Sequence, residues 1–171
     1  MSALAARRAF PFACVIIAST SDEGGEPAPD ARVDDVVAIA HDAGAEPIVA
    51  VVGRGVEVAP PARRVDRPRP ARDDESALRV GVSQLTNSSV NGALLWPAYE
   101  AHASLEGVLA VIDLARRGGA PIVVPVHGDE RLAPAFVVRD LWRELLTTPG
   151  GLGALAELHA ERTATVDVRR G

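Results

Sequence analysis

Lysine is absent from this chain of 171 residues, and its 18 basic side chains other than histidine are all arginines. The absence excludes mechanisms that need a lysine, such as Schiff-base formation, and it excludes the lysine of a phosphate-binding P-loop. The chain is also rich in Ala, Arg, Gly and Pro, a composition typical of GC-rich genomes. Codon usage therefore accounts for the missing lysines in the first instance, and the chemical consequence holds whatever the cause.

Cysteine and aromatic residues are scarce as well. The single cysteine, Cys14, lies in an apolar run, so the chain has neither an internal disulfide nor a zinc site made of cysteines. A lone thiol in such a run is typical of a core residue rather than a nucleophile, and it fits a reducing, cytoplasmic compartment. Aromatic residues make up 4% of the chain, so the core must consist mainly of Val, Leu, Ile and Ala.

A basic surface and a long apolar segment are also missing. The formal net charge is −5, whereas nucleic-acid-binding domains usually have a basic face or stacking aromatics. No apolar run approaches the roughly 18 residues of a membrane-spanning helix. The start of the chain lacks a convincing cleavage site for a signal peptide. We therefore expect neither nucleic acid nor a membrane as a partner.

Strands and helices are expected to alternate along the chain. Buried strands are predicted by the apolar runs at residues 12–19, 47–52, 91–96, 121–127 and 163–168, and the run at 135–138 is similar. Helical spacing is found at residues 33–44, 75–85, 104–117, 139–146 and 152–160. A loop is predicted at 59–74, which holds four prolines and five arginines. This order predicts one α/β domain at 12–171 after an N-terminal arm at 1–11, with a mostly parallel sheet covered on both faces.

Ligands of such sheets bind at the carboxyl ends of the strands. His127 and Asp129 follow the predicted strand at 121–127 and are therefore candidates for a cleft, with a polar turn as the alternative. The four histidines show none of the short spacings typical of a metal site, and no metal ligand is assigned.

Five segments resemble passages of one family in the same order, namely residues 14–19, 41–53, 75–82, 120–128 and 139–146. The family is that of the MobA-like nucleotidyltransferases, in particular the molybdenum cofactor cytidylyl- and guanylyltransferases. The resemblance implies a Rossmann-like three-layer α/β/α nucleotidyltransferase fold. It also implies a residual nucleotide site, which would consist of Ser19, Thr20, Ser21, Gly24 and Gly25 in the first loop and of Ser76 and Arg79 in the helix at 75–85.

The residues that perform the family's chemistry are replaced. In the family's first loop an Arg and a Lys neutralise the nucleotide phosphates, whereas residues 19–26 contain no cation and three carboxylates. Each carboxylate would repel a nearby triphosphate by about 1–4 kcal/mol. The family's Mg²⁺-binding Asp aligns with Trp96 or a neighbour, and Glu100 is the nearest carboxylate. The family's G-D-x-G becomes Gly150-Gly151-Leu152-Gly153, without the Asp.

These replacements favour a protein that has lost the transfer reaction and acts as a binding or regulatory partner, near molybdenum cofactor maturation. Trp96 and Glu100 are then cleft residues, and no catalytic residue is assigned. One alternative is an active Mg²⁺-dependent enzyme that transfers a nucleotide from CTP or GTP to a molybdopterin-type acceptor, with Glu100 or Asp129 on the metal. Another is a structural or oligomeric α/β subunit. The expected partners are a protein or a second copy of the chain, and a nucleotide or another small ligand.

Overall fold

The computed structural model describes residue 2 and residues 9–18, 31–53, 56–67 and 74–171. Within these residues eight strands form one sheet in the order β3-β2-β1-β4-β7-β5-β6, and β8 pairs with β5. The strands are β1 (Phe12–Ile17), β2 (Ile48–Val52), β3 (Arg63–Asp66), β4 (Gly92–Pro97), β5 (Ile122–His127), β6 (Glu130–Arg131), β7 (Ala135–Val138) and β8 (Thr163–Asp167). The helices are α2 (Ala31–Ala43), α3 (Asp74–Ser83), α4 (Leu105–Gly118), α5 (Trp142–Thr147) and α6 (Gly151–Leu158), with 3₁₀ turns η1 (Arg139–Leu141) and η2 (Ala160–Arg162).

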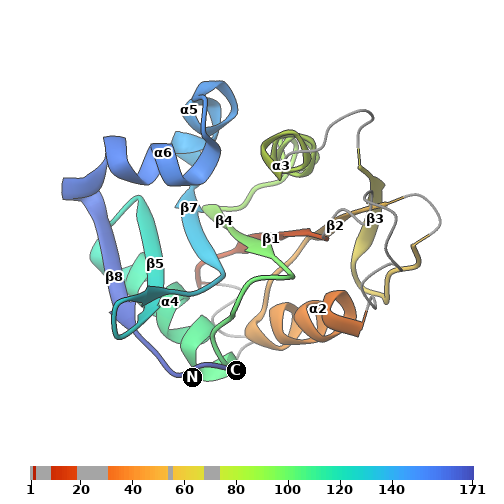
Figure 1. Ribbon diagram of the computed structural model, residues 1–171, viewed down its shortest axis with the longest axis horizontal. Coiled ribbons are helices and arrows are strands. Elements are labelled where there is room, and N and C mark those ends of the chain that lie inside the picture. The colour runs from red at the N-terminus through yellow and green to blue at the C-terminus, as the bar shows by residue number, and fades with distance from the viewer. Residues whose placement is uncertain (1, 3–8, 19–30, 54–55, 68–73) are drawn as a thin grey trace.

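The helices lie on both faces of the sheet, as Figure 1 shows. Side chains of α2 and α4 pack on one face in a core cluster with alternate residues of the strands. The other face packs in a second cluster against α3, α5 and α6. The expected three-layer α/β architecture is confirmed. It follows from strands such as β1, whose six residues are all buried and therefore need apolar side chains on both faces.

Strand directions give the sheet a parallel core with one reversal. β3, β2, β1 and β4 run parallel to one another. β7 runs antiparallel to both β4 and β5, whereas β8 runs parallel to β5. The carboxyl ends of β1, β2 and β4 therefore meet at one edge of the sheet, where ligands of open α/β sheets bind.

Helix ends follow their sequence signals. Ser104 caps α4, because its side chain accepts a hydrogen bond from the N–H of Gly107, and Gly119 ends the helix at φ 64°. Gly44, the predicted end of α2, follows the helix with a φ of 103°, in the left-handed region that favours glycine. None of the helices in the described ranges is long and apolar enough to cross a membrane.

Two local predictions are corrected. The loop predicted at 59–74 is wrong for Arg63–Asp66, which forms β3 along β2, and residues 68–73 of it lie outside the described residues. The pattern Arg-Arg-Val-Asp did not predict a strand, since an edge strand is only partly buried and shows no apolar run. The predicted helix at 139–146 begins instead as the 3₁₀ turn η1 and becomes α-helical at Trp142.

The expected arm at residues 1–11 lies mostly outside the described residues. Of its last residues, Phe10 packs against the core, with its ring centroid 5.8 Å from that of Phe136. The carbonyl of Pro11 accepts a hydrogen bond from the N–H of Asn91 at 2.8 Å. These contacts anchor the chain before β1 at the side of β4.

Candidate functional site

A pocket of about 580 Å³ opens between α3 and α6, at the carboxyl ends of β1 and β4. Its floor consists of strand residues that face the α3 and α6 side of the sheet, namely Ile17, Leu95, Val124 and Ala135. Leu78 of α3 and Ala156 of α6 continue this apolar surface. The pocket is therefore a built concavity with a predominantly apolar base, which is the usual form of a small-molecule site.

Charged and polar groups border this apolar floor. Glu75 comes from the first turn of α3, Tyr99 and Glu100 from the segment after β4, and Arg131 from β6. These residues come from three separate parts of the chain, so the tertiary fold brings them together around one opening. An apolar base with a few polar groups at its margin favours a ligand that has one flat or apolar part and one charged part.

The start of α6 also borders the pocket, through residues 150–153. Gly150 and Gly151 have φ values of 92° and 61°, in the left-handed region that favours glycine. This backbone lets the chain turn into α6 with its first-turn N–H groups beside the pocket. Such N–H groups lack partners within the helix and attract anions. The stretch at residues 150–153, which resembles the family's G-D-x-G without its Asp, thus lies at the pocket.

The residues predicted for the nucleotide site fall into two groups. Ser19, Thr20, Ser21, Gly24 and Gly25 lie outside the described residues. The other two, Ser76 and Arg79, lie on α3. Their role in binding a nucleotide stays a prediction.

Arg79 links α3, which flanks the pocket, to the neighbouring helix α5. Its guanidinium forms an ion pair with Glu75, one turn earlier in α3. Its Nε donates a hydrogen bond to the carbonyl of Leu146 at 3.0 Å. Because Leu146 belongs to α5, Arg79 joins α3 to α5 and holds the carboxylate of Glu75 at the wall of the pocket.

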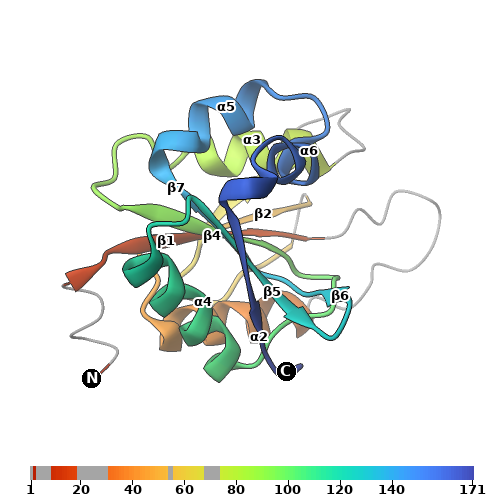
Figure 2. The same ribbon diagram turned by 90° about the vertical axis from the view of Figure 1, so that its left-hand side faces the viewer.

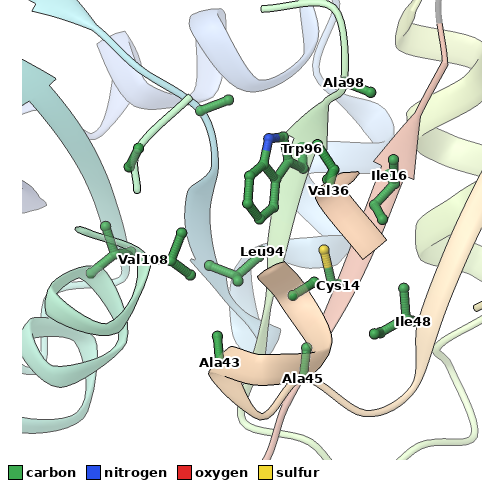
Figure 3. Packing of buried hydrophobic residues seen from close by; sticks show 14 of the residues in the cluster. Cys14, Ile16, Val36, Ala43, Ala45, Ile48, Leu94, Trp96, Ala98 and Val108 are labelled. Carbon is green, nitrogen blue, oxygen red and sulfur yellow. The ribbon is translucent and has the colours of Figure 1, made fainter. Parts of the chain in front are cut away.

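Trp96 lies on the opposite face of the sheet from the pocket. Its side chain is fully buried in the cluster under α2 and α4, and Figure 3 shows the indole beside Val36. Its ring centroid is 5.8 Å from that of His102. In the described part of the chain its Nε1 has no hydrogen-bond acceptor. The residues that follow it, Pro97 and Tyr99, turn to the other face and line the pocket.

The remaining cleft candidates are separated by the fold. Glu100 lines the pocket, whereas His127 and Asp129 are exposed in the β5–β6 hairpin and do not line it. The Nδ1 atom of His127 lies 3.0 Å from the carbonyl oxygen of Val168. From this hairpin it is Arg131 that reaches the pocket wall. The structure therefore brings Glu100 together with Arg131 and leaves His127 at the surface.

Arg67 is a further residue at this edge of the sheet. It follows β3, and its Nη1 donates a hydrogen bond to the carbonyl oxygen of Ala18 at 2.7 Å. Ala18 is the residue directly before the first loop. Arg67, from the arginine-rich stretch, thus reaches the end of β1, which no spacing in the sequence indicates.

The sequence assigned neither Glu75 nor Arg131 to the site, although Arg131 lies in the segment 127–131 at the carboxyl end of a predicted strand. Glu75 resembles the acidic residues that favour a helix N-terminus, and Arg131 lies in a short turn between apolar runs. A search for charged residues at the ends of every predicted element would have included both of them.

Carboxylates are the groups at this site that could hold a divalent cation together with ligand phosphates. Two of them, Glu75 and Glu100, line the pocket, and Glu75 is already paired with Arg79. Over the described ranges, no group of three or more His, Cys, Asp or Glu side chains is arranged to hold a metal ion. These residues do not make a preformed metal centre.

Comparison with known proteins shows the fold. No protein-family model and no curated protein matches the chain. Among solved structures, Rv0371c from Mycobacterium tuberculosis H37Rv is similar with a TM-score of 0.73 and 18% identity, over 94% of this chain and 89% of that one. The 4-diphosphocytidyl-2C-methyl-D-erythritol synthase from Anaerococcus prevotii is similar with a TM-score of 0.67 and 14% identity, over 96% and 90%.

A third similar structure contains ligands. It is glucosyl-3-phosphoglycerate synthase from Mycobacterium tuberculosis in complex with Mn²⁺, UDP and glucosyl-3-phosphoglycerate. Its TM-score is 0.65 at 15% identity, over 99% of this chain and 74% of that one. At these identities the likeness shows the fold alone. The chain therefore has the Rossmann-like fold of nucleotidyltransferases, and its place among the MobA-like proteins stays a prediction.

Proposed function

We propose that the pocket between α3 and α6 binds a nucleotide, and that the protein acts through this binding rather than through nucleotidyl transfer. In this proposal it is a MobA-like protein that has lost catalysis and serves as a binding or regulatory partner, in molybdenum cofactor maturation. The ligand places its base on the apolar floor, and its phosphates lie near Arg131 and the first turn of α6.

The end of β4 is the observation on which the loss of catalysis rests. In the MobA-like family this strand ends in the Asp that holds Mg²⁺. Here Trp96 is buried on the far face of the sheet, and Pro97 and Tyr99 line the pocket. These side chains offer apolar surface and one phenol where the family has a carboxylate. A phosphate chain placed there meets no metal ligand from β4.

Ligand binding is supported by the location and chemistry of the pocket. It lies at the strand ends where ligands of this class of sheet bind. Arg131 supplies a positive charge, and the N–H groups at the start of α6 supply donors for an anion. A structurally similar protein, glucosyl-3-phosphoglycerate synthase, is in complex with UDP and Mn²⁺.

Glu100 favours one alternative function. Its presence in the pocket wall leaves a carboxylate for Mg²⁺, so an active nucleotidyltransferase with this residue on the metal is the second candidate. Asp129, the other carboxylate considered for that role, does not line the pocket.

Calorimetric titration with CTP and with GTP, each with and without Mg²⁺, tests the proposal. We expect CTP or GTP to bind in a 1:1 ratio. In a thermal-shift measurement, the bound nucleotide should raise the free energy of unfolding by about 2.7 kcal/mol at 100 times its dissociation constant. Incubation with the nucleotide, Mg²⁺ and molybdenum cofactor should release no pyrophosphate. Release of pyrophosphate by the unmodified protein, lost in Glu100→Gln, would establish the active nucleotidyltransferase instead. If neither CTP nor GTP binds, both proposed functions are contradicted.

Gly153 offers a matched pair of control variants. It lines the pocket, and a Cβ atom at this position would meet nothing within 4 Å. Gly153→Trp should therefore fill the opening and abolish binding without unfolding the protein, whereas Gly153→Ala should bind normally. Equal binding by both variants would place the ligand elsewhere.

A further inference from the structure

β8 forms an open edge of the sheet. Within the described residues it pairs only with β5. Figure 1 places it at the left margin of the molecule, and Figure 2 shows that side facing the viewer. Thr165 and Asp167 are exposed. An exposed strand edge presents unpaired N–H and C=O groups that can template another strand.

The two outer strands differ in how they are protected. Three of the four residues of β3 are charged, Arg63, Arg64 and Asp66, and edge charges of this kind discourage pairing. β8 reads Thr-Ala-Thr-Val-Asp and has one charge in five residues. It lacks Pro, which commonly blocks such an edge. The sequence of β8 is therefore suited to pairing on both sides.

The register of β8 shows which backbone groups face outward. The N–H of Val168 donates to the carbonyl of Val126 in β5 at 2.8 Å. Backbone groups alternate in direction along a strand, so residues in phase with Val168 bond to β5. Thr163, Thr165 and Asp167 are out of phase and direct their carbonyls away from β5. The N–H groups of Thr165 and Asp167 point outward as well, whereas that of Thr163 donates to Ala160.

These outward groups are self-complementary about a twofold axis at Thr165. With Thr165 opposite Thr165 of a second copy, the two residues exchange both of their N–H to C=O bonds. At each end the N–H of Asp167 then donates to the carbonyl of Thr163 in the other copy. This arrangement does not need the N–H of Thr163, which already donates to the carbonyl of Ala160. On the α4 face, Ala164 lies opposite Val166, and both pack against the core cluster of that face.

The charges that flank β8 are compatible with this pairing. Glu161 lies in η2, directly before β8, and Arg169 follows the strand. In an antiparallel pair with Thr165 on the axis, Glu161 of one copy and Arg169 of the other therefore come to the same end, where opposite charges attract. Leu158, at 67% the most exposed of the large hydrophobic side chains described, lies shortly before β8 and adds apolar surface on this side.

We infer that β8 is a homodimer interface, in which two copies of the chain pair antiparallel through Thr163–Asp167 and join their sheets into one continuous sheet. The partner is a second copy of this chain, because both the hydrogen-bonding groups and the flanking charges match themselves about Thr165. Thr165 is the register partner of Val124, a residue of the pocket floor, so the interface adjoins the pocket through β5. Pairing through β8 does not require the proposed ligand.

Disulfide trapping tests the register. In a hydrogen-bonded antiparallel pair the Cα atoms are about 5.5 Å apart, which suits a disulfide. Thr165→Cys should therefore form a covalent dimer under mild oxidation. Cys14, the only native cysteine, is fully buried and does not compete. Thr163→Cys is the control, because the two copies of residue 163 are offset by four residues, about 13 Å along the strand.

Cross-linking of Thr165→Cys but not of Thr163→Cys supports the inference. Equal cross-linking of both variants, or preferential cross-linking of Thr163→Cys, overturns it. Sedimentation equilibrium of the unmodified protein over a range of concentrations should show a reversible monomer–dimer equilibrium, and a monomer at all concentrations overturns it as well.

Charge reversal gives a second test that does not alter β8 itself. Glu161→Arg and Arg169→Glu should each weaken dimerisation by roughly tenfold, since each variant places like charges together twice per dimer. The double variant should restore the original dissociation constant. Circular dichroism shows whether each variant is folded. Failure of the double variant to recover, with its fold intact, contradicts this register.

Discussion

The guanidinium of Arg67 donates a 2.7 Å hydrogen bond to the carbonyl of Ala18 and so ties the segment after β3 to the end of β1. The two residues are 49 positions apart in the sequence. This bond fixes the point at which the chain leaves the sheet toward the first loop.

Replacing Arg67 should therefore destabilise the protein. We expect Arg67→Ala to lower the free energy of unfolding by about 1.5–3 kcal/mol, the usual range for a hydrogen bond to a charged group. Arg67→Lys keeps a charged donor and should retain part of this stability. Urea denaturation of both variants measures the difference. Equal losses in the two variants would mean that the packing of the guanidinium, rather than its bond to Ala18, matters.

Gly81 allows α3 to lie close to the sheet. A Cβ atom at this position would lie 2.3 Å from Cγ1 of Val15 and 3.1 Å from Cγ2 of Val51. Gly81→Ala should therefore push α3 away from β1 and lower the free energy of unfolding by about 1–3 kcal/mol.

The same substitution at Gly153 is the control for this prediction. A Cβ atom there meets nothing within 4 Å, and the residue is in α6. Gly153→Ala should raise the free energy of unfolding by about 0.5–1 kcal/mol, because Gly is less favourable than Ala within a helix. Guanidinium denaturation of the two variants gives both values. Stabilisation by Gly81→Ala would contradict the close contact of α3 with β1.

Burial of Cys14 makes the stability of the protein depend on alkaline pH. Burial raises the pKa of the Cys14 thiol far above its usual range, so the folded protein keeps the thiol neutral. The unfolded chain ionises near pH 8.5. The free energy of unfolding is therefore unaffected by this ionisation below about pH 8.5. Above that pH it falls by about 1.4 kcal/mol per pH unit, because only the unfolded chain loses the proton.

Cys14→Ala removes this ionisation and isolates its effect. The stability difference between the unmodified protein and the variant should be constant from pH 6 to about pH 8 and should change in favour of the variant above that. Chemical denaturation at a series of pH values measures the difference. A difference that stays constant to pH 10 would show that Cys14 can ionise in the folded protein.

Ser104 should contribute through its cap on α4. Its side chain accepts a hydrogen bond from the N–H of Gly107 at 3.2 Å. Ser104→Ala should lower the free energy of unfolding by about 1 kcal/mol, whereas Ser104→Asp keeps an acceptor and adds a favourable charge at the helix start. Thermal denaturation should rank the Asp variant at or above the unmodified protein. An Ala variant of unchanged stability would show that the cap is dispensable.

The sequence by itself determined the class of fold. Fully apolar runs such as Phe12–Ile17 require burial on both faces, and helical spacing with clear end signals, such as Ser104 and Gly119 around α4, supplies the covering layers. These are local patterns that the chain must satisfy wherever the elements lie. The resemblance to a nucleotidyltransferase scaffold followed from the order of such segments.

Only the tertiary structure decided which side chains share a site. Side chains alternate between the two faces along β4, so Trp96 lies under α2 whereas Leu95 and Pro97 lie on the pocket side. A shift of the strand by one residue would have exchanged these faces. Glu75, Glu100 and Arg131 lie on separate elements and meet at one pocket because of the order of strands in the sheet. That order depends on long-range packing, which spacing along the chain does not encode.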